Sequence, residues 1–223
     1  MNQVNYQKEL EKILQSIQDQ KLVPTLFLHS CCAPCSSYCL EYLCHFFEIT
    51  VFYYNPNISA SEEYKRRVQE QKRLIAAYNE EKRGYPIHIV EGDYEPARFY
   101  DAVKGFEDCK EGGERCFRCF DLRLRQTAEH AKERRFEYFA TTLTISPLKN
   151  AQKINEIGQE IAENIGVKWL PSDFKKKNGY KRSVELSAQY ELYRQDYCGC
   201  SFSKAERELQ KDSERQEISK PKK

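Results

Sequence analysis

Short apolar segments alternate with longer amphipathic ones along the 223-residue chain, and this alternation constrains the fold most. The segments expected to form strands are residues 22–29, 48–58, 86–92, 136–145 and 167–171. The segments with helical spacing of apolar residues are 35–47, 59–82, 96–106, 115–135, 151–165 and 180–195. Strands that alternate with helices predict an α/β fold, in which a parallel sheet carries helices on both faces.

The expected domain organisation is simple. We predict a single α/β catalytic domain over residues 1–202, ending in a helical segment, and a flexible charged tail over residues 203–223. No apolar run approaches the roughly 20 residues of a membrane span. The first 20 residues lack the basic and apolar regions of a signal peptide, so a cytoplasmic protein without membrane contact is expected.

Ten cysteines are the second strong constraint. Thiols stay reduced in the cytosol, so metal binding or redox chemistry is a better interpretation than a disulfide framework. The cysteines form three groupings, with Cys39, Cys44 and Cys109 outside them. The groupings are Cys31-Cys32-x-x-Cys35, Cys116-x-x-Cys119 and Cys198-Gly199-Cys200.

The first grouping, in the segment HSCCAPCS, follows the first expected strand and precedes a helix. Ligands of parallel α/β sheets bind beyond the carboxyl ends of the strands, and a helix N-terminus favours thiolate. Together with Cys116 and Cys119, the adjacent Cys31 and Cys32 make four thiolates. Four thiolates suit a [4Fe–4S] cluster, and a structural zinc ion is the alternative.

The remaining cysteines divide into three kinds, apart from Cys109, whose role stays open. Gly199 allows the tight backbone that a strained, easily reduced disulfide between Cys198 and Cys200 would need. Cys39 and Cys44 are expected to be small core residues. For Cys35 the core, ligand and active-site interpretations all stay open.

Basic residues are concentrated locally although the formal net charge is only +2. The segment KKKNGYKR at 175–182 is the clearest example, and Asn55-Pro56-Asn57 marks the end of the second strand. Taken alone, a basic run of this kind is more often a solvated face than a binding site.

Five segments together resemble one known family, and the resemblance runs from about residue 22 to residue 203. The segments are HSCCAPCS, NPNI, EGGERCFRCFDLRL, TTLTISPLKN and DFKKKNGYKRSVELSAQYELYRQDYCGC. They are similar to the cobalamin-independent epoxyqueuosine reductase family, QueH. The resemblance implies a nucleotide α-hydrolase-like, Rossmann-like fold, without the Ser-Gly-Gly-x-Asp-Ser loop of its ATP-using members. It also implies the last step of queuosine synthesis, in which epoxyqueuosine at the tRNA wobble position is reduced to queuosine.

The resemblance further implies roles for individual residues. The [4Fe–4S] ligands would be Cys31, Cys32, Cys116 and Cys119, and the redox-active disulfide would join Cys198 and Cys200. Cys35 and Asp93 become candidates for binding a second, mononuclear iron or for delivering protons. The partners would be a tRNA carrying epoxyqueuosine and an electron donor that the motifs do not identify. The candidates for RNA contact are Asn55, Lys175, Lys176, Lys177, Tyr180, Lys181 and Arg182.

Two alternative functions remain at this stage. An iron–sulfur tRNA sulfur-transferase on the same scaffold would need the ATP loop that this chain lacks. A zinc-stabilised RNA-binding module would use the same thiols without catalysis.

Overall fold

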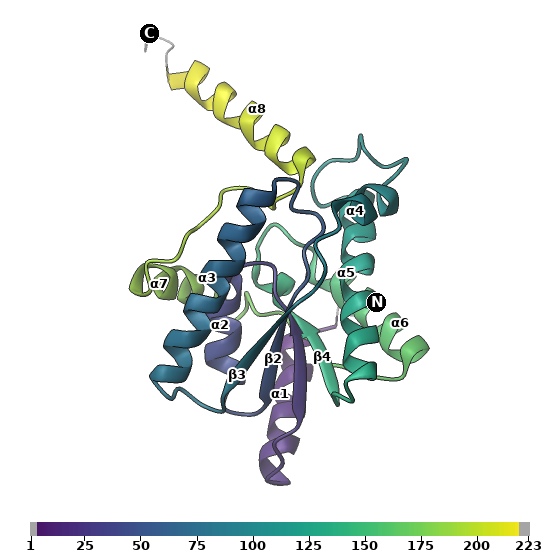
Figure 1. Cartoon of the computed structure of the whole chain (residues 1–223), viewed down its shortest axis with the longest axis vertical. Coiled ribbons are helices and arrows are strands. Elements are labelled where there is room, and N and C mark those ends of the chain that lie inside the picture. Colours follow the sequence, from purple (N-terminus) through teal and green to yellow (C-terminus); the bar gives the residue numbers. More distant parts are fainter. Residues whose placement is uncertain (1–3, 219–223) are drawn as a thin grey trace.

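The structure is a computed structural model, which describes residues 4–218 (Figure 1). Its strands are β1 Thr25–His29, β2 Glu48–Tyr53, β3 Ile87–Glu91, β4 Tyr138–Thr141 and β5 Lys168–Trp169. Its helices are α1 Tyr6–Asp19, α2 Ala33–Leu43, α3 Ser61–Glu80, α4 Pro96–Ala102, α5 Glu114–Glu133, α6 Ala151–Ile165, α7 Gly179–Gln189 and α8 Ser201–Ile218. A 3₁₀ turn, η1 Thr142–Ile145, follows β4.

The five strands form one sheet in the order β3-β2-β1-β4-β5, and every pair is parallel. This confirms the predicted α/β class. The chain moves outward from β1 to β3 and then returns to place β4 on the other side of β1. The strand order therefore reverses next to β1, and a crevice for ligands is expected beyond the carboxyl ends of β1 and β4.

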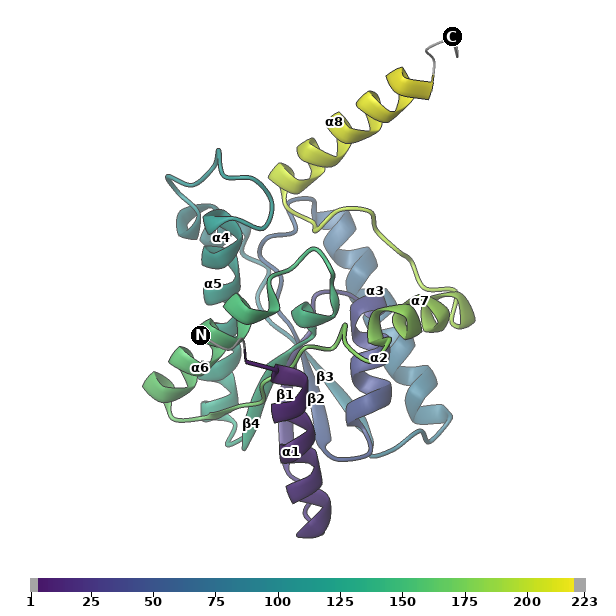
Figure 2. The same cartoon turned by 180° about the vertical axis from the view of Figure 1, so that it is seen from behind.

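Helices cover both faces of the sheet, as Figures 1 and 2 show from opposite sides. One apolar cluster joins α1, α2 and α3 to the sheet through residues such as Leu14, Leu40 and Leu74. The other joins α5 and α6 to the opposite face, where Leu124 and Ile161 are fully buried. The alternating side chains of β1 divide between these clusters, because successive residues of a strand point to opposite faces.

Some element boundaries differ from the prediction. Helix α1 was not predicted, although its face with Leu10, Leu14 and Ile17 is buried. The strand predicted over residues 136–145 ends at Thr141, whose side chain accepts a hydrogen bond from the Leu143 amide and turns the chain into η1.

The charged segment predicted as a tail forms helix α8 as far as Ile218 and projects from the rest of the chain (Figure 1). Its first turns are attached to the body, because Glu206 pairs with the buried Arg115 at 2.7 Å. The division into a domain and a flexible tail stays a prediction, and its last five residues, 219–223, lie outside the described residues. Among residues 4–218, no helix combines the length and apolar character needed to cross a membrane.

We predict that Gly158→Ala weakens the packing of α6 on the sheet. A Cβ atom at Gly158 would overlap the Trp169 ring, whose Nε1 also donates to Asn155 at 3.1 Å. Overpacking of this kind costs about 1–3 kcal/mol. Urea unfolding should show this loss for Gly158→Ala but not for Glu160→Ala on the exposed side of α6. Equal stability of the two variants would contradict the prediction.

Candidate metal and redox centre

Seven cysteines from distant parts of the chain line two adjoining cavities at the carboxyl edge of the sheet. The first, which we call the triad cavity, has a volume of about 360 Å³ and is lined by Cys31, Cys32, Cys35 and Cys198 among others. The second, the α5 cavity, is lined by Cys116, Cys119, Cys198 and Cys200. Cys198 borders both cavities, so the three groupings predicted from the sequence face one region.

The Cys31, Cys32 and Cys35 sulfurs form the tightest group and lie within 4.8 Å of one another. β1 ends just before them, Cys32 occupies the N-cap of α2, and Pro34 lies in the first turn of that helix. The Cys31 and Cys32 sulfurs are 3.8 Å apart. Three sulfurs at this spacing can bind a metal ion or share a cluster.

The three thiols differ in their pKa values. Hydrogen bonds from Cys32 and Cys35, with help from nearby Lys149 and Arg123, hold the pKa of Cys31 well below its ordinary value. The pKa of Cys32 is raised to about 12, mainly because its thiol donates to Cys31. Cys31 is therefore the thiol of the group that ionises most readily, and thiolate is the form that binds metal.

Cys116 and Cys119 lie in the first turns of α5. The Gly112 amide donates to the Cys116 sulfur at 3.2 Å, and the Arg123 guanidinium lies 3.9 Å from the Cys119 sulfur. Burial raises the pKa of Cys119 to about 11, against the opposing effect of Arg123. An amide and a guanidinium directed at sulfur are the contacts that stabilise thiolate ligands.

The Cys198-Gly199-Cys200 segment is held in one conformation. Gly199 has φ +125°, and a Cβ atom there would press on Ile58 and Arg67. The Arg67 guanidinium donates to the Cys198 carbonyl at 3.0 Å, and the Cys200 sulfur accepts from the Ser203 amide at 3.3 Å. All ten cysteines are free thiols in this structure, so the redox-active disulfide stays a prediction.

A buried hydrogen-bond network lies next to the cysteines. It joins Arg123, His29, Asn55 and Thr141, and we call it the polar frame. Arg123 Nε donates to His29 Nε2 at 3.2 Å, and Arg123 also donates to the Asn55 side-chain oxygen. His29 Nδ1 then donates to Thr141 Oγ1 at 2.7 Å. Burial and the Arg123 cation lower the pKa of His29 to about 3, so the imidazole is neutral near pH 7. With both ring nitrogens engaged, His29 acts as a structural residue.

Two candidates from the sequence line neither cavity. Asn55 was expected to contact RNA, but it is buried and its amide also donates to the Ser30 carbonyl at 2.8 Å. Asn55 is therefore part of the polar frame, and its side chain is not accessible to RNA in this structure. Asp93 is exposed beyond β3 and is not among the residues that line either cavity.

Three of the five basic residues in segment 175–182 are paired with carboxylates, Arg182 among them. Lys175 pairs with Asp173, and Lys177 pairs with Glu11. Lys176 and Lys181 make no ion pair with any described residue. Tyr180 is 40% exposed and lines the triad cavity together with Cys31, Cys32 and Cys35.

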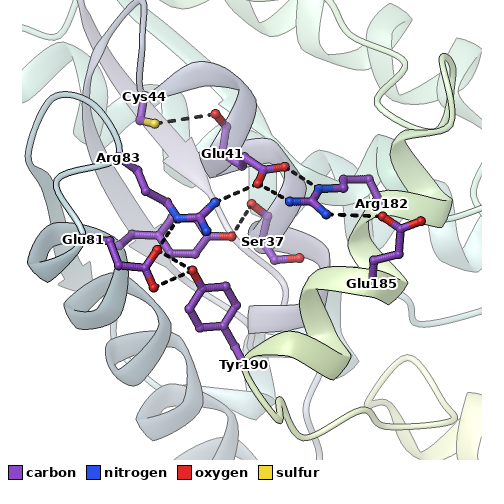
Figure 3. A network of polar contacts seen from close by, with 9 residues as sticks. Ser37, Glu41, Cys44, Glu81, Arg83, Arg182, Glu185 and Tyr190 are labelled. Carbon is purple, nitrogen blue, oxygen red and sulfur yellow. Dashed lines mark hydrogen bonds and ion pairs between the residues drawn. The ribbon is translucent and has the colours of Figure 1, made fainter.

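Arg182 joins helices α7 and α2 through a network of ion pairs (Figure 3). Its guanidinium binds both carboxylate oxygens of Glu41, at 2.8 and 2.9 Å. Arg83 reaches the same carboxylate at 2.7 Å. Glu185 provides a further contact to Arg182 at 3.3 Å. This arrangement gives Arg182 a structural partner in addition to its predicted contact with RNA.

Sequence reasoning did not select three charged residues that belong to the centre. Arg123 was visible only as one member of a basic helix, although it lies one turn after Cys119. Glu111 and Lys149 come from loops and line both cavities. Glu111 lies in the motif EGGERC and Lys149 in TTLTISPLKN, and membership of these motifs was the signal in the sequence that could have identified them.

The fold and the centre together define an α/β protein with a cysteine-rich metal or redox site at the reversal of strand order. A family model described as epoxyqueuosine reductase QueH matches residues 26–206. The chain is 44% identical over 200 residues to the epoxyqueuosine reductase QueH of Streptococcus pyogenes serotype M1, covering 90% of this chain and 78% of the relative. It is 43% identical over 202 residues to that of Staphylococcus epidermidis, covering 90% and 84%. It is 38% identical over 186 residues to that of Thermotoga maritima, covering 82% and 92%. The chain belongs to the QueH family, which confirms the resemblance seen in the sequence.

We predict that the Glu41 carboxylate makes the free energy of unfolding fall more steeply in acid than it would without this charge. Burial would raise the pKa of Glu41, but Arg182 and Arg83 outweigh it and keep that pKa below the ordinary value of 4.5. The ion pairs thus contribute stability above pH 4.5, and this contribution is lost as the pH falls through the lowered pKa of the folded state. Urea unfolding between pH 7 and pH 3 should show a shallower loss of stability for Glu41→Gln than for the wild type. Parallel pH profiles would contradict the prediction.

Proposed function

We propose that this protein reduces epoxyqueuosine to queuosine in tRNA, acting in the cytoplasm at the last step of queuosine synthesis. The reaction converts an epoxide to an alkene, consumes two electrons and two protons, and releases the oxygen as water. The observation that carries the proposal is the meeting of three cysteine groupings at two adjoining cavities in a chain of the QueH family. Removing oxygen from carbon requires a reductant and a proton source close to the substrate.

The cysteines suit an iron–sulfur cluster. We assign Cys31, Cys32, Cys116 and Cys119 as its ligands, because all four residues line the two adjoining cavities. The Cys116 sulfur also accepts from an amide, the Cys119 sulfur from a guanidinium and the Cys31 sulfur from the Thr142 hydroxyl. When bound, a [4Fe–4S] cluster would supply electrons at low potential. Cys35 lies within the tight sulfur group and remains the candidate for a second, mononuclear iron.

Cys198 and Cys200 are proposed to act as a dithiol. Its oxidation to a disulfide forms one S–S bond, breaks two S–H bonds and releases the two electrons and two protons that the epoxide consumes. An external reductant must then restore both thiols. The Glu111 carboxylate accepts a hydrogen bond from Ser203 Oγ at 3.0 Å, and Ser203 Oγ accepts one from the Cys198 amide. Glu111 lines both cavities and is therefore placed to carry protons between the dithiol and the substrate.

The triad cavity is the proposed site of the modified nucleoside. Tyr180 and Tyr197 line it beside the cysteines and offer aromatic faces on which an unstacked base can stack. Lys176 and Lys181 are unpaired among the described residues, which makes them available to the phosphates of an anticodon loop. Lys175, Lys177 and Arg182 would have to exchange carboxylate partners for phosphate.

The proposed activity is tested with protein purified without oxygen. We expect dithionite and epoxyqueuosine-containing tRNA to give queuosine over many turnovers, measured by digestion to nucleosides and mass spectrometry. We expect Cys198→Ser to lose multiple turnover by at least about 100-fold, as for removal of a residue required for proton or electron transfer. Full turnover by Cys198→Ser with the chemical reductant would refute the dithiol role. Stoichiometric zinc without conversion would favour the zinc-stabilised RNA-binding module.

The ligand assignment predicts metal content. Cys31→Ser and Cys116→Ser should each lose most of the iron and sulfide after anaerobic reconstitution, because hydroxyl oxygen is a poor ligand for an iron–sulfur cluster. Cys44→Ala is the matched control, since this thiol is buried in the apolar core and contacts the Glu41 carbonyl. Wild-type iron content in Cys31→Ser would refute the assignment.

A further inference from the structure

Arg123 differs from the other buried arginines in its partners. Arg67 pairs with Glu63 at 2.7 Å, and Arg115 pairs with Glu206 at the same distance. Arg123 is equally buried, but its guanidinium contacts a neutral imidazole, an amide oxygen and the Cys119 sulfur. Among the described residues it has no carboxylate partner. A buried charge without an opposite charge is strongly destabilising, so a compensating anion is expected.

Lys149 is a second cation without a carboxylate partner among the described residues, although it is half-buried and not fully buried like Arg123. It follows η1 in the loop at the tip of β4 and lines both cysteine cavities. Its ammonium group forms no ion pair with any described carboxylate, even though Glu111 lines the same cavities. The charged groups that act most strongly on it are the sulfurs of Cys198, Cys31 and Cys35, which raise its pKa against the opposing effect of burial.

The charges of a loaded centre complement these two cations. Four thiolates around an oxidised [4Fe–4S] core, which is a dication, leave two negative charges. Arg123 and Lys149 supply two positive charges, one from α5 and one from the loop after η1. Two arginines also line the cavities: Arg115 is paired with Glu206, and Arg194 donates to Ser187 Oγ at 2.9 Å.

We propose that Arg123 and Lys149 are the built-in counter-cations of the metal–thiolate centre, positioning residues that retain the metal and raise its reduction potential. This inference rests on the proposed function. Reduction adds a negative charge to the centre, and a cation held nearby in a poorly solvated site stabilises the reduced state more than the oxidised state. Loss of one cation should therefore lower the potential and weaken metal retention.

Lys149 provides the sharper test, because Arg123 also supports the polar frame. Lys149→Met removes the charge and keeps the length of the side chain, whereas Lys149→Arg keeps the charge. Lys12→Met removes an exposed charge on α1 as the matched control. Each protein is reconstituted without oxygen, its potential is measured by spectroscopic redox titration, and its loss of iron to a chelator is timed.

We expect Lys149→Met to have a lower reduction potential and an affinity for its metal centre reduced by about 10- to 100-fold. Lys149→Arg and Lys12→Met should match the wild type in both measurements. If the wild type holds iron and converts its substrate while Lys149→Met keeps the same potential and iron retention, the inference is wrong and the proposed function stands. If the wild type holds no iron and converts no substrate, both are wrong.

Discussion

The buried guanidinium of Arg123 connects the elements on which the whole centre depends. Arg123 comes from α5, His29 ends β1, and Asn55 follows β2, so three segments far apart in the sequence meet at one side chain. The same residue lies beside Cys119, and His29 comes two residues before Cys31. Fixing this guanidinium therefore fixes the Cys116-x-x-Cys119 helix relative to the first cysteine grouping. A rigid frame of this kind is what an array of metal ligands requires.

The strand order explains why the frame can form where it does. β1 lies between β2 and β4, so the loops after these three strands open toward one crevice. Cysteine side chains occupy this crevice, where related folds commonly have a glycine-rich phosphate loop. The Cys198-Gly199-Cys200 segment reaches the same crevice from the C-terminal part of the chain. It is held there by Arg67 and by the backbone hydrogen bond from Ser59 to Gly199 at 3.1 Å.

Local patterns made much of this architecture predictable, whereas long-range contacts were not. The strands and the cysteine groupings follow from short segments, because alternation and C-x-x-C spacing are properties of neighbouring residues. Arg123 looked like a surface charge because its helix carries several arginines, and its partners lie 94 and 68 residues away. Asn55 looked exposed at a strand end, although the closing of the frame buries it. Helix α8 was missed because its anchor is the long-range pair between Arg115 and Glu206.

The chemical identity of the Arg123 partners is as informative as their position. An aspartate at position 55 would neutralise the guanidinium within the protein, and the positive charge would no longer be available to the sulfurs. Asparagine satisfies the same hydrogen bond while leaving that charge uncompensated, and the lowered pKa of His29 keeps a second positive charge from appearing beside it. The frame thus orients Arg123 without neutralising it. Because an unpaired buried cation destabilises a fold, its presence beside Cys119 supports the proposal that the cysteines hold an anionic metal centre.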